Sequence, residues 1–456
     1  MFRNCTKVTC IVLALLMSMS ILLVGCGENK GGVSSNTGDK NSAPVVSGEK
    51  VKIRFAHGWT SGDEAGKVGA DAINKFAQDN KDNFELLQEV IAGDEMKSKI
   101  RIDIAGNNIP DAWMYWGSAS DSGSFVKSGI LLDIDEYLKV SKNTKKEDFP
   151  EGGWDGFRID GKVWGIPLQG YIGYWFYNTE IFDKYNLKYP KTYEELLAVS
   201  KVLNENGIIP LAMGSKAGNP GHFFMSELYA QFQGGVDELR NLSSNWTFDT
   251  ENMHKVADLI ADMKKNKVLP SDTVANGDWG PSFALYNEGK AATVNSYTWM
   301  LGSLKPETAA VTEIGPAPKM PGASVDPATI ISRGGSYGML IYNKSFQDPK
   351  KQAAIVALAD MISSDAFVEE QLYKTGQIPV KNIDIDDSKL EVPMLAEVLE
   401  YAKDKENVTN HWLNFPDTKP WADAQNYLDE LFAGSMTPDE YIKTIQDSLD
   451  KVKAEQ

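Results

Sequence analysis

One cysteine stands where the surrounding sequence could support covalent chemistry. Cys26 follows Leu23-Val24-Gly25 at the end of an apolar run over residues 11–24. A positively charged start, an apolar stretch and a small residue before a cleavage point are typical of an export signal. A thiol directly after that point resembles a bacterial lipobox, in which the cysteine is acylated and becomes the new N-terminus. We therefore predict a signal peptide over residues 1–25 and a lipid on Cys26.

The alternative for this segment is an uncleaved membrane anchor. The apolar run has about 14 residues, whereas a helix that spans the hydrocarbon core needs roughly 20. After the cysteine, residues 26–50 are polar and rich in glycine, which is the composition of a flexible tether. We expect the rest of the chain to work at the extracytoplasmic face of the cell membrane, held to the bilayer through Cys26.

The remaining reactive residue types exclude several kinds of site. Cys5 and Cys10 lie in the predicted signal peptide, so the exported part has no thiol for a disulfide, a thiolate metal site or a nucleophile. The four histidines are scattered without His-x-x-x-His spacing, and we expect neither a metal nor a cofactor. A formal net charge of -17 argues against binding to nucleic acid or to an anionic bilayer by basic patches.

The elements that must position a site follow from the spacing of apolar residues. A chain of 456 residues exceeds the size at which one hydrophobic core divides, so we expect two lobes. An alternation of strands and helices begins the exported part, over residues 51–57, 64–80, 84–91, 95–105 and 112–116. This order predicts a parallel sheet with right-handed crossovers. Because ligands bind beyond the carboxyl ends of such strands, Trp59 and Trp116 are expected at the same edge.

Turn and cap signals organise the middle of the chain. Asp160-Gly161 lies between two apolar arms and predicts a hairpin over residues 158–167. A capping box at Thr192-Tyr-Glu-Glu195 predicts the start of a helix that ends near residue 206. Strands are predicted over residues 171–177 and 208–213. Further helices are predicted near residues 222–233, 251–266, 280–288, 349–374, 392–403, 418–433 and 437–453.

Several sequence blocks occur in an order that resembles one known family. The blocks are GNNIPD at 106–111, DGKVWGIP at 160–167, WFYNT at 175–179, PKTYEEL at 190–196, NEGKAA at 287–292 and AGSMTPDE at 433–440. Together they closely resemble the extracellular solute-binding proteins of carbohydrate ABC transporters, family 1, over nearly all of residues 51–453. The resemblance implies an α/β, periplasmic-binding-protein-like fold similar to maltose-binding protein. In that fold, two αβ lobes are joined by a three-segment hinge, and the ligand cleft lies between them.

The resemblance also implies how the chain is divided and what it meets. One lobe would comprise residues 51–168 plus 331–363, and the other residues 169–330 plus 364–456. The chain would cross between the lobes near residues 167–171, 328–334 and 363–365. Such lobes close on a ligand by a hinge motion, and the permease subunits of an ABC importer recognise the closed form. We expect a monomer that does not bind nucleic acid.

A sugar site requires particular side chains. A pyranose presents flat C–H faces and a rim of hydroxyls, so its site needs aromatic plates and short polar groups. The chain has 11 tryptophans and 17 tyrosines. By motif position, Trp116, Trp299 and Trp421 match the places where maltose-type relatives carry aromatics that stack on sugar rings. A second group of candidate ligand-binding residues comprises Trp59, Asp63, Asp121, Gln169, Tyr171, Trp279 and Arg333.

Other interpretations remain open for these residues. Tryptophans are often core residues, and Asp63 could serve only as an N-terminal charge for the helix after it. A secreted glycosidase or lyase would also have a sugar site, but it needs two carboxyls about 5 to 9 Å apart across the scissile bond, and no pair is placed for that. An anionic cargo would call for paired basic residues, of which only Arg333 is a candidate; polyamine or iron is a further alternative. We predict a neutral sugar or oligosaccharide as the ligand, and no enzyme activity.

Overall fold

The computed structural model describes residues 50–60, 64–91, 93, 95–408 and 414–455. The predicted signal peptide, the lipid on Cys26, nearly all of the tether and the candidate residue Asp63 lie outside these ranges. Among the described residues, no helix has both the length and the apolar character needed to cross a membrane.

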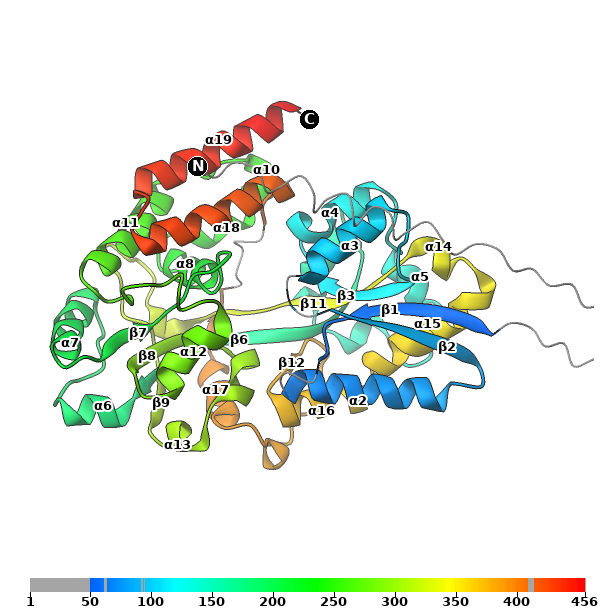
Figure 1. The fold of residues 1–456 in the computed structure, drawn as a ribbon, viewed down its shortest axis with the longest axis horizontal. Coiled ribbons are helices and arrows are strands. Elements are labelled where there is room, and N and C mark those ends of the chain that lie inside the picture. Colours follow the sequence, from blue (N-terminus) through cyan, green and yellow to red (C-terminus); the bar gives the residue numbers. More distant parts are fainter. Residues whose placement is uncertain (1–49, 61–63, 92, 94, 409–413, 456) are drawn as a thin grey trace, which may run out of the picture. The chain divides into compact units, whose positions relative to one another are not determined.

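A mixed sheet of nine strands lies at the centre of the described part of the chain, in the order β2-β1-β3-β11-β6-β8-β7, with β9 and β12 also paired to β6 (Figure 1). The strands of this sheet are β1 (Val51–His57), β2 (Phe84–Val90), β3 (Ala112–Trp116), β6 (Ile166–Asn178), β7 (Ile209–Ala212), β8 (Ala291–Tyr297), β9 (Thr312–Gly315), β11 (Arg333–Ile341) and β12 (Ile378–Pro379). Two small sheets pair β4 (Arg158–Ile159) with β5 (Lys162–Val163) and β10 (Ile330–Ile331) with β13 (Glu406–Asn407).

The long strand β6 joins two groups of strands. Its first half pairs with β11, where Gly170 lies opposite Gly335, and its second half pairs with β8, where Phe176 lies opposite Val294. The predicted parallel arrangement is confirmed for β1, β2 and β3, which run parallel to one another. In contrast, β11 runs antiparallel to both β3 and β6. The sheet as a whole is therefore mixed, because a strand from late in the chain inserts between two earlier ones.

Helices and short 3-10 helices surround the sheet. The α-helices are α2 (Glu64–Asp79), α3 (Glu95–Ala105), α4 (Ala119–Lys127), α5 (Ile134–Leu138), α6 (Thr179–Lys184), α7 (Tyr193–Glu205), α8 (Gly221–Tyr229), α9 (Gly235–Arg240), α10 (Leu242–Asn245), α11 (Glu251–Lys265), α12 (Trp279–Asn287), α13 (Pro306–Ala309), α14 (Asn343–Phe346), α15 (Pro349–Ile362), α16 (Asp365–Thr375), α17 (Leu395–Ala402), α18 (Thr418–Ala433) and α19 (Pro438–Glu455). The 3-10 helices are η1 (Lys146–Asp148), η2 (Glu151–Phe157), η3 (Thr298–Ser303), η4 (Pro327–Thr329) and η5 (Asp387–Lys389).

Local signals in the sequence account for several of these boundaries. In the hairpin of β4 and β5, Asp160 and Gly161 have φ angles of 53° and 77°, the pair of positive values that a type I′ turn requires. Thr192 caps α7 by accepting the backbone N–H of Glu195 at 3.3 Å, as predicted. One prediction was wrong: the single helix expected over residues 349–374 is two helices, because Ser363 is the C-cap of α15 and Ser364 is the N-cap of α16.

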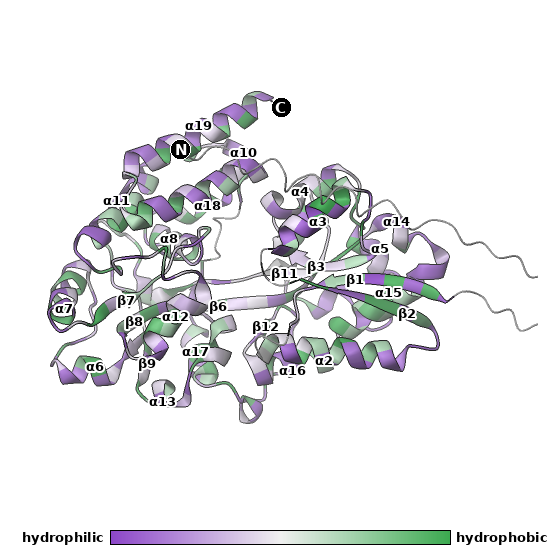
Figure 2. Ribbon diagram, viewed as in Figure 1, coloured by the Kyte–Doolittle hydropathy of each residue, from purple (hydrophilic) through white to green (hydrophobic). Residues whose placement is uncertain are grey.

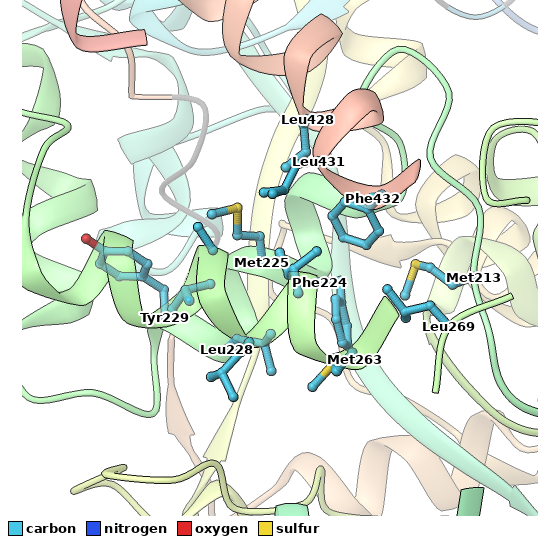
Figure 3. Packing of buried hydrophobic residues seen from close by; sticks show 14 of the residues in the cluster. Met213, Phe224, Met225, Leu228, Tyr229, Met263, Leu269, Leu428, Leu431 and Phe432 are labelled. Carbon is cyan, nitrogen blue, oxygen red and sulfur yellow. The ribbon is translucent and has the colours of Figure 1, made fainter. Parts of the chain in front are cut away.

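Besides a small cluster of Ala230, Ile330 and Val408, three larger hydrophobic clusters hold the described elements together. One contains β1, β3 and α15, a second contains α8, α11, α18 and α19, and a third contains α12 and α17. Figure 3 shows the second cluster, where Phe224 of α8 lies near Met263 of α11 and Phe432 of α18. Along α2 and α18, hydrophobic residues are interleaved with hydrophilic ones (Figure 2), as expected of helices with one face on a core.

Strand β6 is buried on both faces. Trp175 and Tyr177 belong to the second cluster, whereas Tyr174 and Phe176 belong to the third. Successive side chains of a strand point to opposite sides of its sheet, so one strand supplies both cores. The position of β6 therefore fixes the elements on its two faces relative to each other.

Candidate functional site

A lysine lies between two of the three tryptophans expected to stack on a sugar. Lys97, in α3, has its ammonium nitrogen 4.7 Å from the ring centroid of Trp116 and 4.4 Å from that of Trp421. Trp116 ends strand β3 and Trp421 lies in the first turn of α18. Attraction between a cation and the ring quadrupole stabilises such an arrangement, more strongly where water is excluded. Segments about 300 residues apart in the chain thus meet at one side chain.

Asp121 is the counter-ion of Lys97. The distance from Lys97 Nζ to Asp121 Oδ1 is 3.0 Å, and the carboxylate side chain has no exposed surface. Ser118, the N-cap of α4, accepts the Asp121 backbone N–H at 3.0 Å and donates its hydroxyl to Asp121 Oδ2 at 3.1 Å. Nearby, the Thr418 hydroxyl donates to the carbonyl oxygen of Ser120 at 2.9 Å. Asp121, predicted as an acceptor for sugar hydroxyls, therefore has its carboxylate engaged by groups of the protein.

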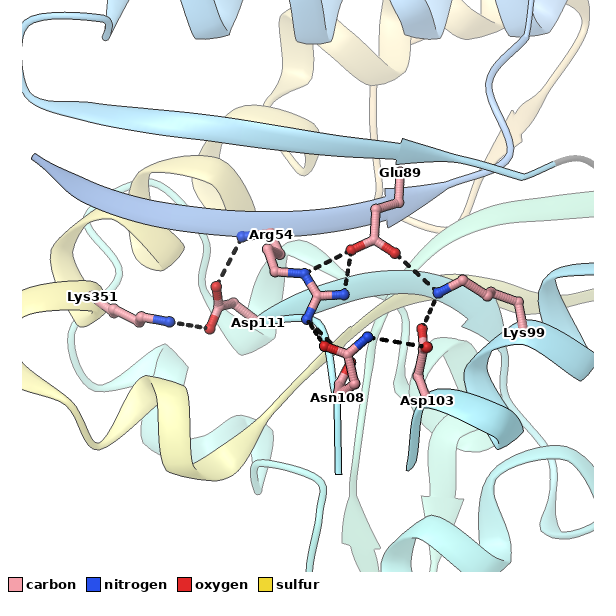
Figure 4. Close-up of polar contacts among 7 residues, drawn as sticks. All are labelled: Arg54, Glu89, Lys99, Asp103, Asn108, Asp111 and Lys351. Carbon is pink, nitrogen blue, oxygen red and sulfur yellow. Dashed lines mark hydrogen bonds and ion pairs between the residues drawn. The ribbon is translucent and has the colours of Figure 1, made fainter. Parts of the chain in front are cut away.

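A polar network (Figure 4) joins β1, β2, α3 and the loop before β3. Helix α3 carries Lys97, and β3 carries Trp116. Arg54 of β1 donates from Nε to Glu89 of β2 at 2.8 Å and from Nη1 to Asn108 Oδ1 at 2.9 Å. Lys99 of α3 pairs with the other oxygen of Glu89 at 3.1 Å. These bonds join the middle of α3 and the loop before β3 to the neighbouring strands.

A second group of aromatic residues lies on other elements. The rings of Tyr297 and Trp299 are stacked, with centroids 4.8 Å apart and planes at 9°. Trp279 meets Trp299 edge-on at 5.1 Å, and Tyr171 does so at 5.4 Å. Phe223 lies 5.5 Å from Trp299 and completes the group. Edge-to-face and stacked contacts of this kind fix each ring against the others.

His222 lies beside the second aromatic group and within electrostatic range of Lys97 in the first. Its ring is 4.5 Å from that of Phe223, and the charges of Lys97 and Asp121 affect its pKa. Nδ1 is 2.9 Å from the carbonyl oxygen of Gly218, which can only accept, so Nδ1 carries the hydrogen and Nε2 is left as an acceptor. Burial, helped by the Lys97 charge, lowers the pKa of His222 to about 4. The imidazole is therefore uncharged at neutral pH.

Gln169 lies on the strand that passes beside the first group. In β6 it pairs with Tyr337 of β11, and the ring of Tyr337 is 5.0 Å from that of Trp116. Tyr337 in turn pairs with Trp116 across β11 and β3. Gln169 and Tyr171 therefore occupy alternate positions of one strand; Gln169 is separated from Trp116 by Tyr337, whereas the ring of Tyr171 contacts that of Trp299.

Two predicted site residues make other contacts. Trp59 is 6% exposed and belongs to the first hydrophobic cluster, where its ring meets Phe367 edge-on at 5.4 Å. Arg333 donates from Nη2 to the carbonyl oxygen of Ala402 in α17 at 3.0 Å, and its backbone N–H bonds to the Asn407 side chain. The indole of Trp59 is therefore placed in a hydrophobic core, and the guanidinium of Arg333 bonds β11 to α17.

Sequence reasoning did not single out Lys97, Phe223 or Tyr297. Lys97 follows the buried Met96 in an ordinary amphipathic helix, so nothing in its local pattern marks it as a partner of distant indoles. Tyr297 precedes Trp299 by two residues and could have been found by that spacing. Across the described ranges, no group of three or more His, Cys, Asp or Glu side chains is placed to hold a metal ion.

Comparisons with known proteins agree with this architecture. An uncharacterised ABC transporter extracellular-binding protein of Pyrococcus horikoshii is 23% identical over 297 residues, 63% of this chain and 65% of that protein. A probable sugar-binding periplasmic protein of Mesorhizobium japonicum is 24% identical over 364 residues, 74% of this chain and 77% of that protein. The solved structure of a chitin oligosaccharide binding protein superposes with a TM-score of 0.77 at 19% identity, covering 89% of this chain and 99% of the other.

The solved structure shares the fold, which is that of the periplasmic solute-binding proteins, as the sequence blocks implied. The family model of the bacterial extracellular solute-binding proteins matches residues 61–367, more than half of the chain. The chain belongs to the bacterial extracellular solute-binding protein family.

Proposed function

We propose that this protein is a lipid-anchored extracellular receptor that captures a neutral sugar or oligosaccharide and delivers it to the permease of an ABC importer. The single observation that supports it best is the placement of Trp116 and Trp421, from distant parts of the chain, around the ammonium of Lys97. Trp299 lies in a second aromatic group, stacked on Tyr297. The names of the Mesorhizobium relative and of the chitin oligosaccharide binding protein point to the same class of ligand.

The chemistry of the two aromatic groups and of His222 suits an uncharged ligand. Indole faces pack against the C–H faces of a pyranose, and His222 Nε2 offers an acceptor to a hydroxyl. Among the described residues, Trp421 Nε1 is buried and has no acceptor, so a sugar oxygen would satisfy it. The charges of Lys97 and Asp121 cancel within the protein. An ion outside this pair would find no surplus charge to bind.

The two-lobed division remains part of the proposal. We assign residues 51–168 plus 331–363 to one lobe and residues 169–330 plus 364–456 to the other, with crossings near 167–171, 328–334 and 363–365. Support comes from β6, which pairs with β11 at one end and with β8 at the other. The ligand would stabilise a closed arrangement only through contacts that the open arrangement lacks.

A carbohydrate-active enzyme is the alternative. A glycosidase needs two carboxyls flanking the scissile bond, whereas the carboxylate of Asp121 is held by Lys97 and Ser118. Incubation with a panel of cello-, xylo-, manno-, malto- and chito-oligosaccharides, followed by an assay for new reducing ends, separates the two functions. We expect a thermal shift with at least one glycan and no new reducing ends. Release of reducing ends would favour the enzyme.

The lipid anchor has its own test. In cells grown with an alkyne analogue of palmitate, the native chain should be labelled and found in the membrane fraction. The Cys26→Ser variant should lose the label and leave that fraction, whereas Cys10→Ser should not change where the exported chain is found. Equal labelling of the native and Cys26→Ser proteins would contradict the proposed anchor.

A further inference from the structure

A half-buried glutamate lies behind the second aromatic group. Glu227, in α8, accepts three hydrogen bonds: from the Tyr297 hydroxyl at 2.6 Å, from Asn295 Nδ2 at 2.8 Å and from Trp175 Nε1 at 3.2 Å. Tyr297 is the residue whose ring stacks on Trp299. The carboxyl therefore holds the outer end of the ring that supports Trp299, although no contact between Glu227 and Trp299 is needed for this.

The same carboxyl lies against β6 two residues beyond the predicted crossing near 167–171, where β6 bonds to a residue of the predicted crossing near 328–334. At Gly173 of β6, an added Cβ would lie 2.7 Å from Glu227 Oε1 and 2.9 Å from the Tyr297 ring, so only glycine leaves room for the carboxyl. The Gly173 backbone N–H donates to the Ser332 carbonyl oxygen at 2.7 Å. The Tyr297 hydroxyl also interacts with the Ser332 side chain. The carboxyl of Glu227 thus contacts both Tyr297 of the second aromatic group and the backbone of β6 at Gly173.

Glu227 lies at a cavity that has room for water. Glu227, Gly173, Ser332 and Tyr401 are among the residues that line a cavity of about 40 Å³. A buried water needs roughly 10 to 15 Å³ of such space, so a few water molecules fit and can exchange a proton with the carboxyl. No ligand of the size of a sugar fits there.

We propose that Glu227 is a positioning residue for the sugar site, which fixes the Tyr297–Trp299 stack and makes sugar affinity depend on the charge of its own carboxyl. This inference rests on the proposed function, because it assigns Trp299 to the sugar site. The same coupling acts in the protein without sugar: the environment of Trp299 changes when Glu227 gains or loses its proton.

The direction of the effect follows from the hydrogen bonds. An ionised carboxylate accepts from all three donors, and bonds to a charged acceptor are roughly twice as strong as neutral ones. A protonated Glu227 must donate its own hydrogen, and Tyr297 is the one partner whose oxygen can accept it while its hydroxyl turns toward Ser332. The Tyr297 ring is then held less firmly. We expect sugar to bind more tightly when Glu227 is ionised.

The carboxyl of Glu227 changes its protonation state in a pH range where binding can be measured. Burial raises the pKa of Glu227 to about 7, opposed by the hydrogen bonds from Tyr297, Trp175 and Asn295. The ionisable groups that face it are the phenols of Tyr297 on β8 and Tyr401 on α17, which are uncharged at neutral pH; burial raises their pKa values further. In the described part of the chain, no cation is paired with this carboxyl.

The first test needs no ligand. In protein labelled with 5-fluorotryptophan, with resonances assigned by Trp299→Phe and Trp175→Phe, the signal of Trp299 should shift with pH and have a midpoint near 7. The shift should be absent in Glu227→Gln. The matched control is Glu238→Gln, because Glu238 also accepts a tyrosine hydroxyl, that of Tyr229 at 2.7 Å, outside the aromatic group. A Trp299 titration that survives in Glu227→Gln would overturn the inference.

The second test measures binding. Calorimetry with the same panel of neutral oligosaccharides should give about fivefold tighter binding at pH 8 than at pH 5.5 in the native protein, and a flat profile in Glu227→Gln. If Glu227→Gln fails to fold, Tyr297→Phe keeps the ring but removes the hydroxyl and should flatten the profile in the same way. If no sugar binds but the Trp299 signal still shifts with pH, the sugar function is rejected while the coupling between Glu227 and Trp299 stands. Equal pH dependence in native protein and Tyr297→Phe would reject the coupling.

Discussion

At the scale of single residues, Trp116 offers the clearest test of the aromatic groups. Replacement of Trp116 by alanine removes the indole next to Lys97 and should weaken sugar binding about tenfold, or about 1.4 kcal/mol, because the sugar loses a stacking surface. The measurement is a calorimetric titration of both proteins. Trp164→Ala is the control, since its indole bonds to the Ile159 carbonyl in the hairpin, away from the site. Unchanged affinity in Trp116→Ala would remove this residue from the site.

The pair of Lys97 and Asp121 makes a prediction about stability. Lys97→Met leaves the Asp121 carboxylate buried without its counter-ion, which should cost about 3 to 5 kcal/mol in the free energy of unfolding. The double variant Lys97→Met with Asp121→Asn removes both charges and should recover much of that loss. Urea denaturation of the four proteins gives the coupling energy between the two sites. Additive losses would mean that the pair does not interact as its distance suggests.

The sequence could identify residues of the candidate site only where they belong to a motif. Trp116, Trp299 and Trp421 were expected at the site from their place in sequence blocks, and the structure puts the first and last of them on the same ammonium. The partners could not be predicted. Lys97 and Asp121 come from two different helices, and a pairing between helices leaves no period or spacing in the sequence that would reveal it.

At the scale of elements, the junction of β11 and β6 depends on one glycine. An added Cβ at Gly338 would lie 2.0 Å from the carbonyl oxygen of Ile166 in β6. Backbone atoms cannot move aside as a side chain can, so Gly338→Ala should lower the free energy of unfolding by about 1 to 3 kcal/mol or more. Gly280→Ala is the matched control, because a Cβ there meets nothing within 4 Å, and a helical alanine should be neutral or slightly stabilising. Similar losses in both variants, measured by thermal unfolding, would contradict this account.

Elements with strong local signals were predictable, and breaks within them were less so. The hairpin at Asp160-Gly161 and the capped helix after Thr192 were found where expected. The helix predicted over residues 349–374 is instead divided between α15 and α16, because Ser363 and Ser364 interrupt a pattern whose apolar spacing continues on both sides. Periodicity shows which face is apolar but does not show where a chain turns.

At the scale of the whole molecule, Glu227 should make stability depend on pH. Its pKa is about 7 in the folded protein against an ordinary value of 4.5, so the folded state binds more protons than the unfolded state between these values. The stabilising contribution is full below about pH 4.5 and is lost as pH rises through 7, amounting to about 3 kcal/mol. His222 acts in the opposite sense as pH falls from 6.5 to 4.

Because these two groups oppose each other, the test is a difference between proteins. Urea denaturation at pH 5 and pH 8 should show that the native chain loses more stability on going to pH 8 than Glu227→Gln does. Glu238→Gln provides the control, since its carboxyl is half-buried and accepts from Tyr229 in the same way. Identical pH profiles for native protein and Glu227→Gln would mean that Glu227 keeps its ordinary titration in the fold.

The topology of the whole sheet was only partly predictable. The parallel order of β1, β2 and β3 follows from their alternation with helices, which sequence periodicity reveals. The insertion of β11 between β3 and β6 joins residues more than 150 positions apart. No local pattern encodes such a pairing, and the likeness to a known family implied only that residues 331–363 share a lobe with residues 51–168.

Calorimetric titration of the full chain carrying Cys26→Ser, with the panel of neutral oligosaccharides and with charged ligands as controls, tests the central claim most directly. The account predicts one-to-one binding of at least one neutral glycan, in the micromolar range or tighter, with little dependence on salt, because the charges at the site are already paired. Binding of an anion or a polyamine alone, or no heat with any glycan, would contradict it.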